Sequence, residues 1–246
     1  MKNLIEVNGQ MYKGRVLVTG TSRGIGRETA LLFVRNGFEV IGIDREESSI
    51  DIPGYFHLVR DIRDKDKLPS INGITYIVNN AGVLYDYEKP MENNLYGAFN
   101  IEDVYVKPNL GNLSSIVNIS STTALNGHGE REYTCSKGAL ISYTVYLANN
   151  LAPYGVRVNC VIPGACETEM NKLYIDDPEV YRQVGEQNLI GRWGRPEENA
   201  RAIYFLSVDA TFTTGETLLV DGGELIRNWY IRSKGEKRPY DNIIQI

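Results

Sequence analysis

Seven short runs of apolar, mostly β-branched residues recur along the chain. They cover residues 15–20, 38–44, 55–59, 75–80, 114–120, 156–162 and 216–222. The apolar positions within each run are nearly continuous rather than alternating, which is typical of parallel strands covered on both faces. Stretches with helical character lie between most of the runs. The pattern therefore predicts an α/β fold with an open, doubly wound parallel sheet of about seven strands and helices on both faces.

The length and composition fit one domain. The 246 residues are 42% hydrophobic, which is enough to bury a good core in a single α/β domain over residues 1–246. Residues 1–12 form an N-terminal extension, and Asn8 and Gly9 between two apolar runs predict a small hairpin there. Residues 224–246 form a C-terminal tail after the last predicted strand.

Charge and residue counts exclude several classes of protein. The net charge is −5 and the only basic stretch is short, which argues against a nucleic-acid partner. No apolar run approaches the ~18 residues of a membrane span, and residues 1–10 lack the apolar core of a signal peptide. Three cysteines without a C-x-x-C motif, and only two histidines, predict a cytoplasmic protein with no disulfide framework and no metal site.

A glycine-rich loop follows the first predicted strand of the sheet. It reads "TGTSRGIG" over residues 19–26, and its three glycines, Gly20, Gly24 and Gly26, allow a tight turn and close approach of a ligand. The helix that follows offers unpaired N–H groups to a pyrophosphate. Asp44 ends the next strand, 24 residues after Gly20, where an acid accepts hydrogen bonds from an adenosine ribose. This combination predicts a Rossmann-type dinucleotide-binding domain.

The charges beside this loop bear on which dinucleotide binds. Asp44 should repel a 2′-phosphate, which favours NAD. Arg23 and Arg45 act in the opposite sense, because both can pair with that phosphate. NAD is therefore the preferred cofactor, and NADP stays open.

Further motifs follow in order along the chain. They are "NNAG" at residues 79–82, "IVNISS" at 116–121, "YTCSK" at 133–137, "VNCVIPGACET" at 158–168 and "VDGG" at 220–223. With the glycine loop, these motifs resemble those of the short-chain dehydrogenase/reductase family over roughly residues 13–223. The resemblance implies an NAD(P)-dependent enzyme that interconverts a secondary alcohol and a carbonyl by hydride transfer.

The resemblance also implies a catalytic set of Asn94, Ser121, Tyr133 and Lys137. Tyr133 would be the general acid and base. An ammonium ~4 Å from the phenol, at an effective dielectric constant of ~20, favours the phenolate by about 4 kcal/mol, or roughly 3 pKa units. Lys137 lies four residues after Tyr133 on the same helix face, so we expect it to lower the pKa of Tyr133 and to hold the nicotinamide ribose.

Two of these assignments have close rivals. Ser121 would hold the substrate oxygen, and Ser120 is its neighbour in the same motif. Asn94 resembles the asparagine that anchors a proton-relay water, with Asn93 beside it and a helix N-cap as its structural alternative.

The remaining cofactor-binding residues follow from the same motifs. Asp61 and Ile62 would contact the adenine. Asn79, Ala81 and Gly82 would line the crevice where the strand order reverses, whereas Asn80 would brace neighbouring strands. The other predicted contacts are Ser22, Arg23 and Ile25 in the glycine loop, Arg45 beside Asp44, and Pro163, Gly164 and Thr168 near the nicotinamide. Cys166 in the last loop is either a redox-sensitive thiol or a small packing residue.

The chain is shorter than the family pattern before Asn79, before Asn94 and between Ser121 and Tyr133. The first deletion should reduce the helix after the third strand to a short turn, and the second leaves little room for a helix before Asn94. The deletions should also alter the wall beside the substrate and the backbone placement of Asn94. The loop before Tyr133 is polar, and His128 and Glu130 suit a hydroxyl-rich substrate better than an acyl chain. A sugar or polyol with NAD is therefore the leading substrate class.

Two alternatives remain. One is an NADPH-dependent 3-oxoacyl or small-ketone reductase, and the other is a nucleotide-sensing protein without turnover. The helix that begins at Tyr133 is apolar on more than one face. One face should pack on the sheet, and the other predicts a homotetramer or homodimer.

Overall fold

The computed structural model describes residues 4–7 and 9–226, and it is built around a seven-stranded sheet. The strand order is β5-β4-β3-β6-β7-β8-β9, and all neighbouring strands are parallel. Each apolar run of the sequence becomes one strand, so the predicted fold class is confirmed. The strands are β3 (Arg15–Thr19), β4 (Glu39–Asp44), β5 (Tyr55–Val59), β6 (Ile74–Asn79), β7 (Ser115–Ile119), β8 (Arg157–Pro163) and β9 (Thr217–Val220).

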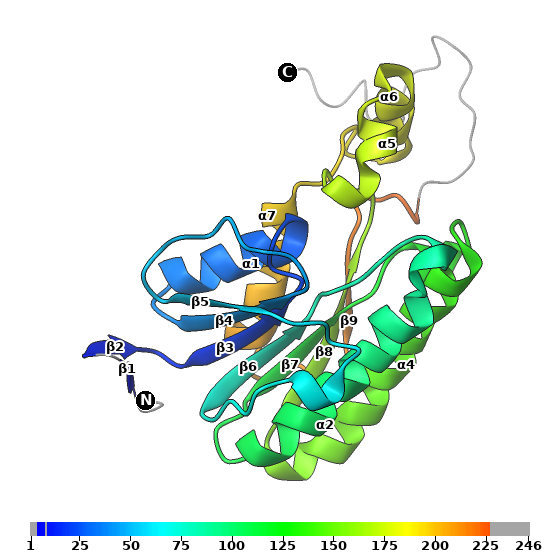
Figure 1. The fold of residues 1–246 in the computed structure, drawn as a ribbon. Coiled ribbons are helices and arrows are strands. Elements are labelled where there is room, and N and C mark those ends of the chain that lie inside the picture. The colour runs from blue at the N-terminus through cyan, green and yellow to red at the C-terminus, as the bar shows by residue number, and fades with distance from the viewer. Residues whose placement is uncertain (1–3, 8, 227–246) are drawn as a thin grey trace, which may run out of the picture.

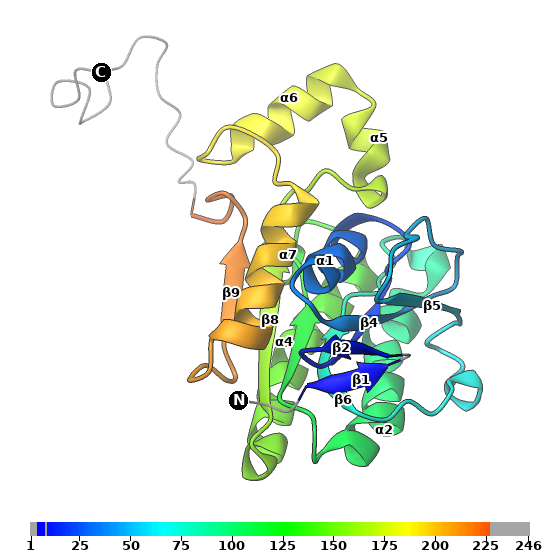
Figure 2. The same ribbon diagram turned by 90° about the vertical axis from the view of Figure 1, so that its left-hand side faces the viewer.

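Helices cover both faces of the sheet (Figures 1 and 2). One face carries α1 (Gly24–Arg35) and α7 (Pro196–Tyr204), and the other carries α2 (Gly97–Asn109) and α4 (Arg131–Leu151). Successive strand side chains point to opposite faces. Val16 and Val18 accordingly pack with Phe33 of α1, whereas Leu17 packs with Ile101 of α2 and Leu140 of α4. The continuous apolar runs are thus explained by two cores, one on each face.

The chain reverses direction across the sheet between β3 and β6. From β3 the order runs outward through β4 and β5, and the chain then crosses back to β6 and continues through β7, β8 and β9. In open parallel sheets, ligands bind at such a switch point, outside the carboxyl ends of the strands. The fold therefore places the glycine loop after β3 and the "NNAG" segment after β6 side by side.

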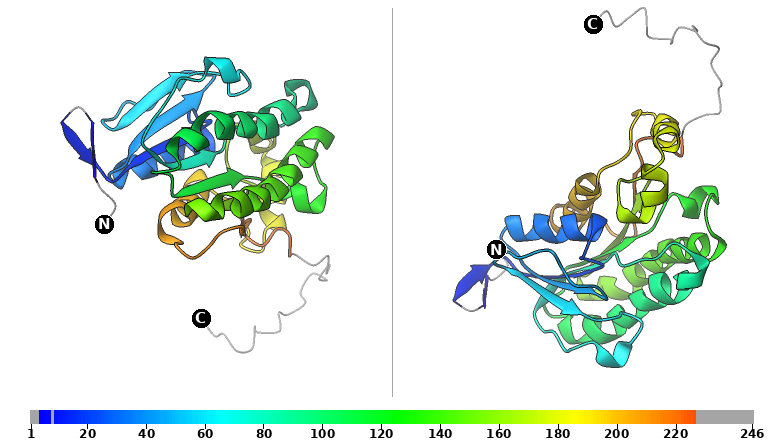
Figure 3. Two further views of the ribbon diagram at one scale, coloured as in Figure 1. Left: turned by 90° about the horizontal axis from the view of Figure 1, so that it is seen from below. Right: turned by 45° about the horizontal axis from the view of Figure 1, so that its top comes forward.

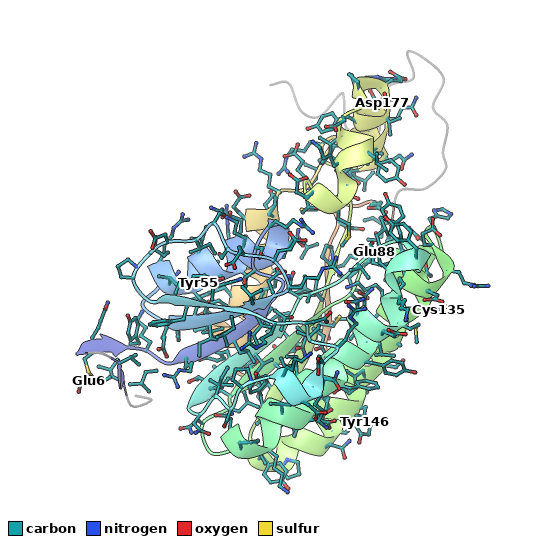
Figure 4. All side chains as sticks on the ribbon, viewed as in Figure 1. Glu6, Tyr55, Glu88, Cys135, Tyr146 and Asp177 are labelled. Atoms are coloured by element: carbon teal, nitrogen blue, oxygen red, sulfur yellow. The ribbon has the colours of Figure 1, made fainter. Side chains whose placement is uncertain are left out.

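Above these carboxyl ends, a short helical segment projects between β8 and α7 (Figures 1 and 3). It consists of η5 (Glu169–Asn171), α5 (Lys172–Ile175) and α6 (Pro178–Gln187). Asp177, at the top of Figure 4, caps α6 by accepting a hydrogen bond from the backbone N–H of Glu179 at 3.0 Å.

The shortened segments contain only short turns, as expected. η1 (Lys65–Lys67) follows β5, and η2 (Asp86–Glu88) precedes the π-helix η3 (Met91–Tyr96). The remaining short elements are α3 (Thr123–Asn126), η4 (Ala152–Tyr154) and the π-helix η6 (Phe205–Asp209).

At the N-terminus, β1 (Ile5–Val7) and β2 (Gln10–Tyr12) pair as an antiparallel hairpin apart from the main sheet. Of the expected C-terminal tail, residues 227–246 lie outside the described residues. Among the helices of the described part, none is both long and apolar enough to cross a lipid bilayer.

Candidate active site

A cavity of about 500 Å³ opens at the carboxyl ends of the strands, over the switch point. A volume of this size is suited to a small organic ligand. Most of the predicted site residues line it: Gly20, Arg23, Gly24, Ile25, Asp44, Arg45, Asp61, Ile62, Ala81, Gly82, Ser121, His128, Glu130, Tyr133, Lys137, Pro163, Gly164 and Thr168. Four predicted residues, Ser22, Gly26, Asn79 and Asn94, are not part of the lining.

The backbone of the glycine loop is held by β4 and packs closely against the start of α1. Gly20 has φ 74° and donates its N–H to the carbonyl of Ile43 at 2.8 Å. A Cβ at Gly26 would lie 2.1 Å from the carbonyl oxygen of Gly20, so only glycine allows α1 to start this close to β3. Gly26 therefore shapes the loop from behind, while Gly20 and Gly24 face the cavity. The N-terminus of α1 is left open towards the cavity, as the pyrophosphate site requires.

Asp44 fixes the backbone at the rim of the cavity, on the side of the glycine loop. Its carboxylate accepts the backbone N–H of Ser22 at 3.0 Å and that of Glu46 at 3.1 Å. Glu46 in turn binds Arg23 through two bonds of 2.9 Å. The other arginine, Arg45, lies 3.6 Å from Glu88. Both guanidinium groups beside Asp44 therefore already have a carboxylate partner.

Farther along the rim, Arg63 hydrogen-bonds to Asp61 and lowers the pKa of that carboxyl.

Of the two asparagines at the end of β6, Asn79 departs from its predicted place in the crevice, whereas Asn80 has the bracing role predicted for it. Asn79 turns away from the cavity and donates to the side chain of Asn118 on β7 at 2.9 Å. Asn80 lines the cavity and donates to the carbonyls of Thr19 and Gly20 at 2.9 and 3.1 Å. Since neighbouring side chains on a strand point to opposite faces, a shift of one residue reverses the assignment. Asn80 thus braces β6 against β3 from within the crevice.

Ser121, Tyr133 and Lys137 come together in the cavity. Ser121 follows the end of β7, and its hydroxyl lies close enough to the phenol of Tyr133 to lower the pKa of that phenol. The Nζ atom of Lys137 lies 5.7 Å from the centroid of the Tyr133 ring and donates to the carbonyl of Ile119 at 2.8 Å. The rival Ser120 uses its hydroxyl to donate to the carbonyl of Lys137 at 2.7 Å. The geometry thus favours Ser121 as the serine available to a ligand.

The predicted lowering of the Tyr133 pKa is not found in the protein alone. Burial raises the pKa of the Tyr133 phenol, and the hydrogen bond from Ser121 only partly opposes it. Burial also lowers the pKa of Lys137 to about 8. Desolvation penalises the charged form of each group, and it is the largest cause of both shifts. Tyr133 is therefore a protonated phenol at neutral pH, in the form that donates a proton.

Asn94 lies within the π-helix η3 and is 2% exposed. Its Oδ1 accepts the N–H of Val83 at 2.8 Å, and its Nδ2 donates to the carbonyl of Val83 and to the hydroxyl of Ser136, both at 3.0 Å. Asn94 thus ties the loop after β6 to α4, and its position inside the helix excludes the N-cap alternative. Its neighbour Asn93 lines the cavity instead.

The cavity has walls that no sequence motif marked. They include Tyr85 after β6, Asn171 and Tyr174 around α5, Val184 of α6, Trp193, and Glu224 directly after "VDGG". Such walls come from loops and short helices, which lack the regular spacing that makes a strand or a motif visible in sequence. Only Glu224 had a signal, its position next to the two turn glycines.

Cys166 also lines the cavity, but its side chain is buried and its pKa is raised to about 12 by burial. A thiol with so little thiolate is poorly reactive, so the packing interpretation holds. Cys135 lies on the exposed side of α4 (Figure 4). Within residues 4–7 and 9–226 there is no group of three or more side chains able to hold a metal ion.

Two family models match the chain. Residues 14–53 match the model described as short chain dehydrogenase, and residues 70–224 match the one described as enoyl-(acyl carrier protein) reductase. The 3-oxoacyl-[acyl-carrier-protein] reductase of Thermotoga maritima is 32% identical, over 87% of this chain and 99% of its own. The chain belongs to the short-chain dehydrogenase/reductase family. It is thus an oxidoreductase that acts on alcohol or carbonyl groups with NAD or NADP.

Other members of this short-chain dehydrogenase/reductase family differ in substrate. The L-fucose dehydrogenase of Bos taurus is 31% identical, over 94% of this chain and 96% of its own. Among solved structures, the aldohexose dehydrogenase of Thermoplasma acidophilum has a TM-score of 0.81 at 29% identity, covering 91% of this chain and 98% of its own. A putative 2-deoxy-D-gluconate 3-dehydrogenase of Agrobacterium tumefaciens with bound NADP also has a TM-score of 0.81 at 29% identity, covering 89% and 98%.

Proposed function

We propose that this short-chain dehydrogenase/reductase oxidises a sugar or polyol at a secondary hydroxyl with NAD, or catalyses the reverse reduction. The observation that carries the proposal is the convergence of Ser121, Tyr133 and Lys137 in the same cavity as the glycine loop and Asp44. The hydride must pass between substrate carbon and nicotinamide, so both ligands need one cavity.

The residues present fit the cofactor. Gly20 and Gly24 leave room at the open N-terminus of α1 for the pyrophosphate, and Asp44 keeps lone pairs free for the adenosine ribose. Asp61 and Ile62 would contact the adenine. Ser22, Arg23 and Ile25 would border the pyrophosphate, and Ala81, Gly82, Pro163, Gly164 and Thr168 would surround the nicotinamide half. The nicotinamide supplies the acceptor or donor of the hydride.

The chemistry of the protein's own groups follows from their positions. Ser121 would donate a hydrogen bond to the substrate oxygen and stabilise charge that develops there. Tyr133, protonated at neutral pH, would give its proton to that oxygen in carbonyl reduction and take it back in alcohol oxidation. Lys137 would hold the nicotinamide ribose and stabilise the phenolate. Asn94 would keep the loop after β6 and α4 in register.

The preference for NAD is supported by the partners of the two arginines. Asp44 is an anion at the place where a 2′-phosphate would bind. Arg23 and Arg45, two of the cavity-lining cations that could compensate for it, are each paired with a carboxylate, Glu46 and Glu88. Binding NADP would require these pairs to break, whereas NAD leaves them intact.

The preference for a sugar or polyol is supported by the cavity mouth. His128 and Glu130 supply polar groups there, and Tyr85 and Tyr174 supply aromatic rings. Aromatic rings can pack on the apolar faces of a sugar, and carboxylates can accept hydrogen bonds from its hydroxyl groups. The similarity to fucose and aldohexose dehydrogenases supports the same substrate class.

The similarity to 3-oxoacyl reductases keeps an NADPH-dependent 3-oxoacyl or small-ketone reductase as the second candidate. A nucleotide sensor without turnover is less well supported, because Ser121, Tyr133 and Lys137 are all present and line the same cavity.

We also propose a cytoplasmic homotetramer or homodimer. Tyr96, Val145 and Tyr146 are exposed on the outer side of η3 and α4, and Tyr146 points away from the sheet in Figure 4. A second copy covering this face would bury them.

The test is an activity screen of the purified protein. NAD⁺ and NADP⁺ reduction is measured with aldoses, polyols and simple secondary alcohols, and NADH and NADPH oxidation with 3-oxoacyl thioesters and small ketones. We expect turnover of an aldose or polyol with NAD⁺, reduced roughly 100-fold to 10,000-fold in Tyr133→Phe. Activity on thioesters with NADPH alone would favour the second candidate, and cofactor binding without any turnover would favour the sensor.

A further inference from the structure

Glu224 is a cavity-lining carboxylate that no motif assigns. It lies in the turn after β9, and its Oε2 accepts a hydrogen bond from the backbone N–H of Ala165 at 3.1 Å. A Cβ on Gly164 would lie 2.8 Å from the same Oε2. The carboxylate therefore reaches this position only because residue 164 is glycine.

The backbone around Glu224 fixes where the carboxylate lies. Asp221 accepts the N–H groups of Gly223 and Leu225, each at 2.9 Å, which closes the turn. Gly164 donates its N–H to the carbonyl of Val220 at 3.0 Å. The loop that Glu224 contacts is joined in turn to the end of β7, because the N–H of Thr122, next to Ser121, donates to the carbonyl of Pro163 at 3.0 Å. Two hydrogen bonds, Ala165–Glu224 and Thr122–Pro163, thus connect Glu224 through the loop at residues 163–165 to the segment after β7 that contains Ser121.

The charge of Glu224 has no counterion in the described part of the chain. Its one hydrogen-bond partner there is the N–H of Ala165, so Oε1 has none, and no lysine, arginine or histidine pairs with it. A partly buried carboxylate loses solvation unless hydrogen-bond donors replace the water. An ionised carboxylate accepts hydrogen bonds and donates none, so its complement is a ligand hydroxyl, and an anionic ligand is repelled.

We infer that Glu224 is a specificity-determining residue whose Oε1 accepts a hydrogen bond from a hydroxyl of a neutral, polyhydroxylated substrate bound at Ser121 and Tyr133. The inference rests on the proposed function and narrows its substrate class. Neutral sugars and polyols are accepted, and sugar acids and other anions are disfavoured by the negative charge of Glu224, which has no counterion among the described residues.

The experiment compares wild type with Glu224→Gln and Glu224→Ala. The glutamine keeps an oxygen for the N–H of Ala165 but removes the charge. Glu216→Gln is the matched control. Glu216 lies directly before β9, at the opposite end of this strand from Glu224, and does not line the cavity. Each protein is assayed for kcat/KM with NAD⁺ on a neutral aldose, the corresponding aldonate and a simple secondary alcohol without neighbouring hydroxyls. NAD⁺ affinity is measured separately by calorimetry.

We expect kcat/KM of Glu224→Gln for the aldose to fall roughly tenfold to a hundredfold, the loss of one charge-assisted hydrogen bond. The loss on the simple alcohol should be far smaller, the preference for aldose over aldonate should shrink, and NAD⁺ affinity should stay within a few-fold. Glu224→Ala should lose more, and Glu216→Gln should behave as wild type.

Equal losses on aldose and simple alcohol, with weaker NAD⁺ binding, would overturn the inference and leave Glu224 a support of the loop. Unchanged discrimination in both Glu224 variants would overturn it as well. Wild-type protein that oxidises the simple alcohol but no sugar would refute the substrate class of the proposed function itself, before any variant is compared.

Discussion

At the scale of single residues, the pKa shifts of the ionisable groups in the cavity differ from those that their spacing in the sequence predicts. Lys137 was expected to make Tyr133 acidic, yet burial dominates both groups and lowers the pKa of Lys137 to about 8. In the unfolded chain this lysine titrates near 10.4. Between these two values the unfolded state binds more protons than the folded state, so the contribution of Lys137 to stability rises with pH through this window.

We therefore predict that wild type gains about 2 kcal/mol of unfolding free energy relative to Lys137→Met between pH ~7 and pH ~9.5. The measurement is urea denaturation of both proteins at the two pH values. Lys107→Met, at an exposed position on α2, is the control and should show no such pH dependence. A constant difference between wild type and Lys137→Met would mean that Lys137 keeps its charge when buried.

The pair of Arg23 and Glu46 gives a second prediction at this scale. Glu46→Gln should free the guanidinium to bind a 2′-phosphate and raise the ratio of NADP⁺ to NAD⁺ affinity by roughly tenfold. Equilibrium binding of both cofactors measures this ratio. Glu47→Gln, exposed and one residue farther along, is the control. If the ratio does not move in Glu46→Gln, the pair has no part in cofactor choice.

At the scale of elements, the junction between β3 and α1 shows what a glycine motif requires. Gly26 does not touch the cavity, but its backbone lies against Gly20 and the side chain of Asn80. The three glycines therefore serve two purposes. Gly20 and Gly24 make room for the ligand, and Gly26 lets the helix approach the strand.

Gly26→Ala should accordingly destabilise the fold by ~2 kcal/mol or more and weaken cofactor binding, because its Cβ has no space. Gly138→Ala on α4 is the matched control, since nothing lies within 4 Å of the added Cβ. It should stabilise the protein by up to ~1 kcal/mol through helix propensity. Thermal unfolding and NAD⁺ calorimetry distinguish the two. Equal melting temperatures would show that the loop relaxes around the extra methyl group.

At the scale of the whole molecule, the outer face of η3 and α4 is the main candidate for self-association. Its exposed Tyr96 and Tyr146 adjoin Phe99 and Tyr143, which form an aromatic row between the helices. Side chains of this kind are enriched in the centres of protein interfaces.

Tyr146→Glu should lower the mass of the assembly measured by light scattering after gel filtration, because it places a charge in the proposed interface. Met11→Glu, at an exposed position of the N-terminal hairpin, is the control and should leave the mass unchanged. If wild type and Tyr146→Glu have the same mass, the interface does not lie on this face.

Sequence alone predicted the parallel sheet and the glycine loop with Asp44, and the resemblance to the family pointed to Ser121, Tyr133 and Lys137, whose catalytic roles stay predictions. These features depend on local periodicity and on short spacings along one strand or one helix, which the order of residues specifies directly. The sequence pattern predicted no strand order, because right-handed crossovers still leave several ways to connect alternating strands and helices.

Tertiary structure alone decided the side-chain directions of Asn79 and Asn80, the carboxylate partners of Arg23 and Arg45, the pKa of Tyr133 and the position of Glu224. Each depends on burial or on a neighbour that is distant in sequence: Ala165 and Glu224 are 59 residues apart. Solvation and pairing of a charge are properties of the space around it, and that space is created only when remote segments pack together.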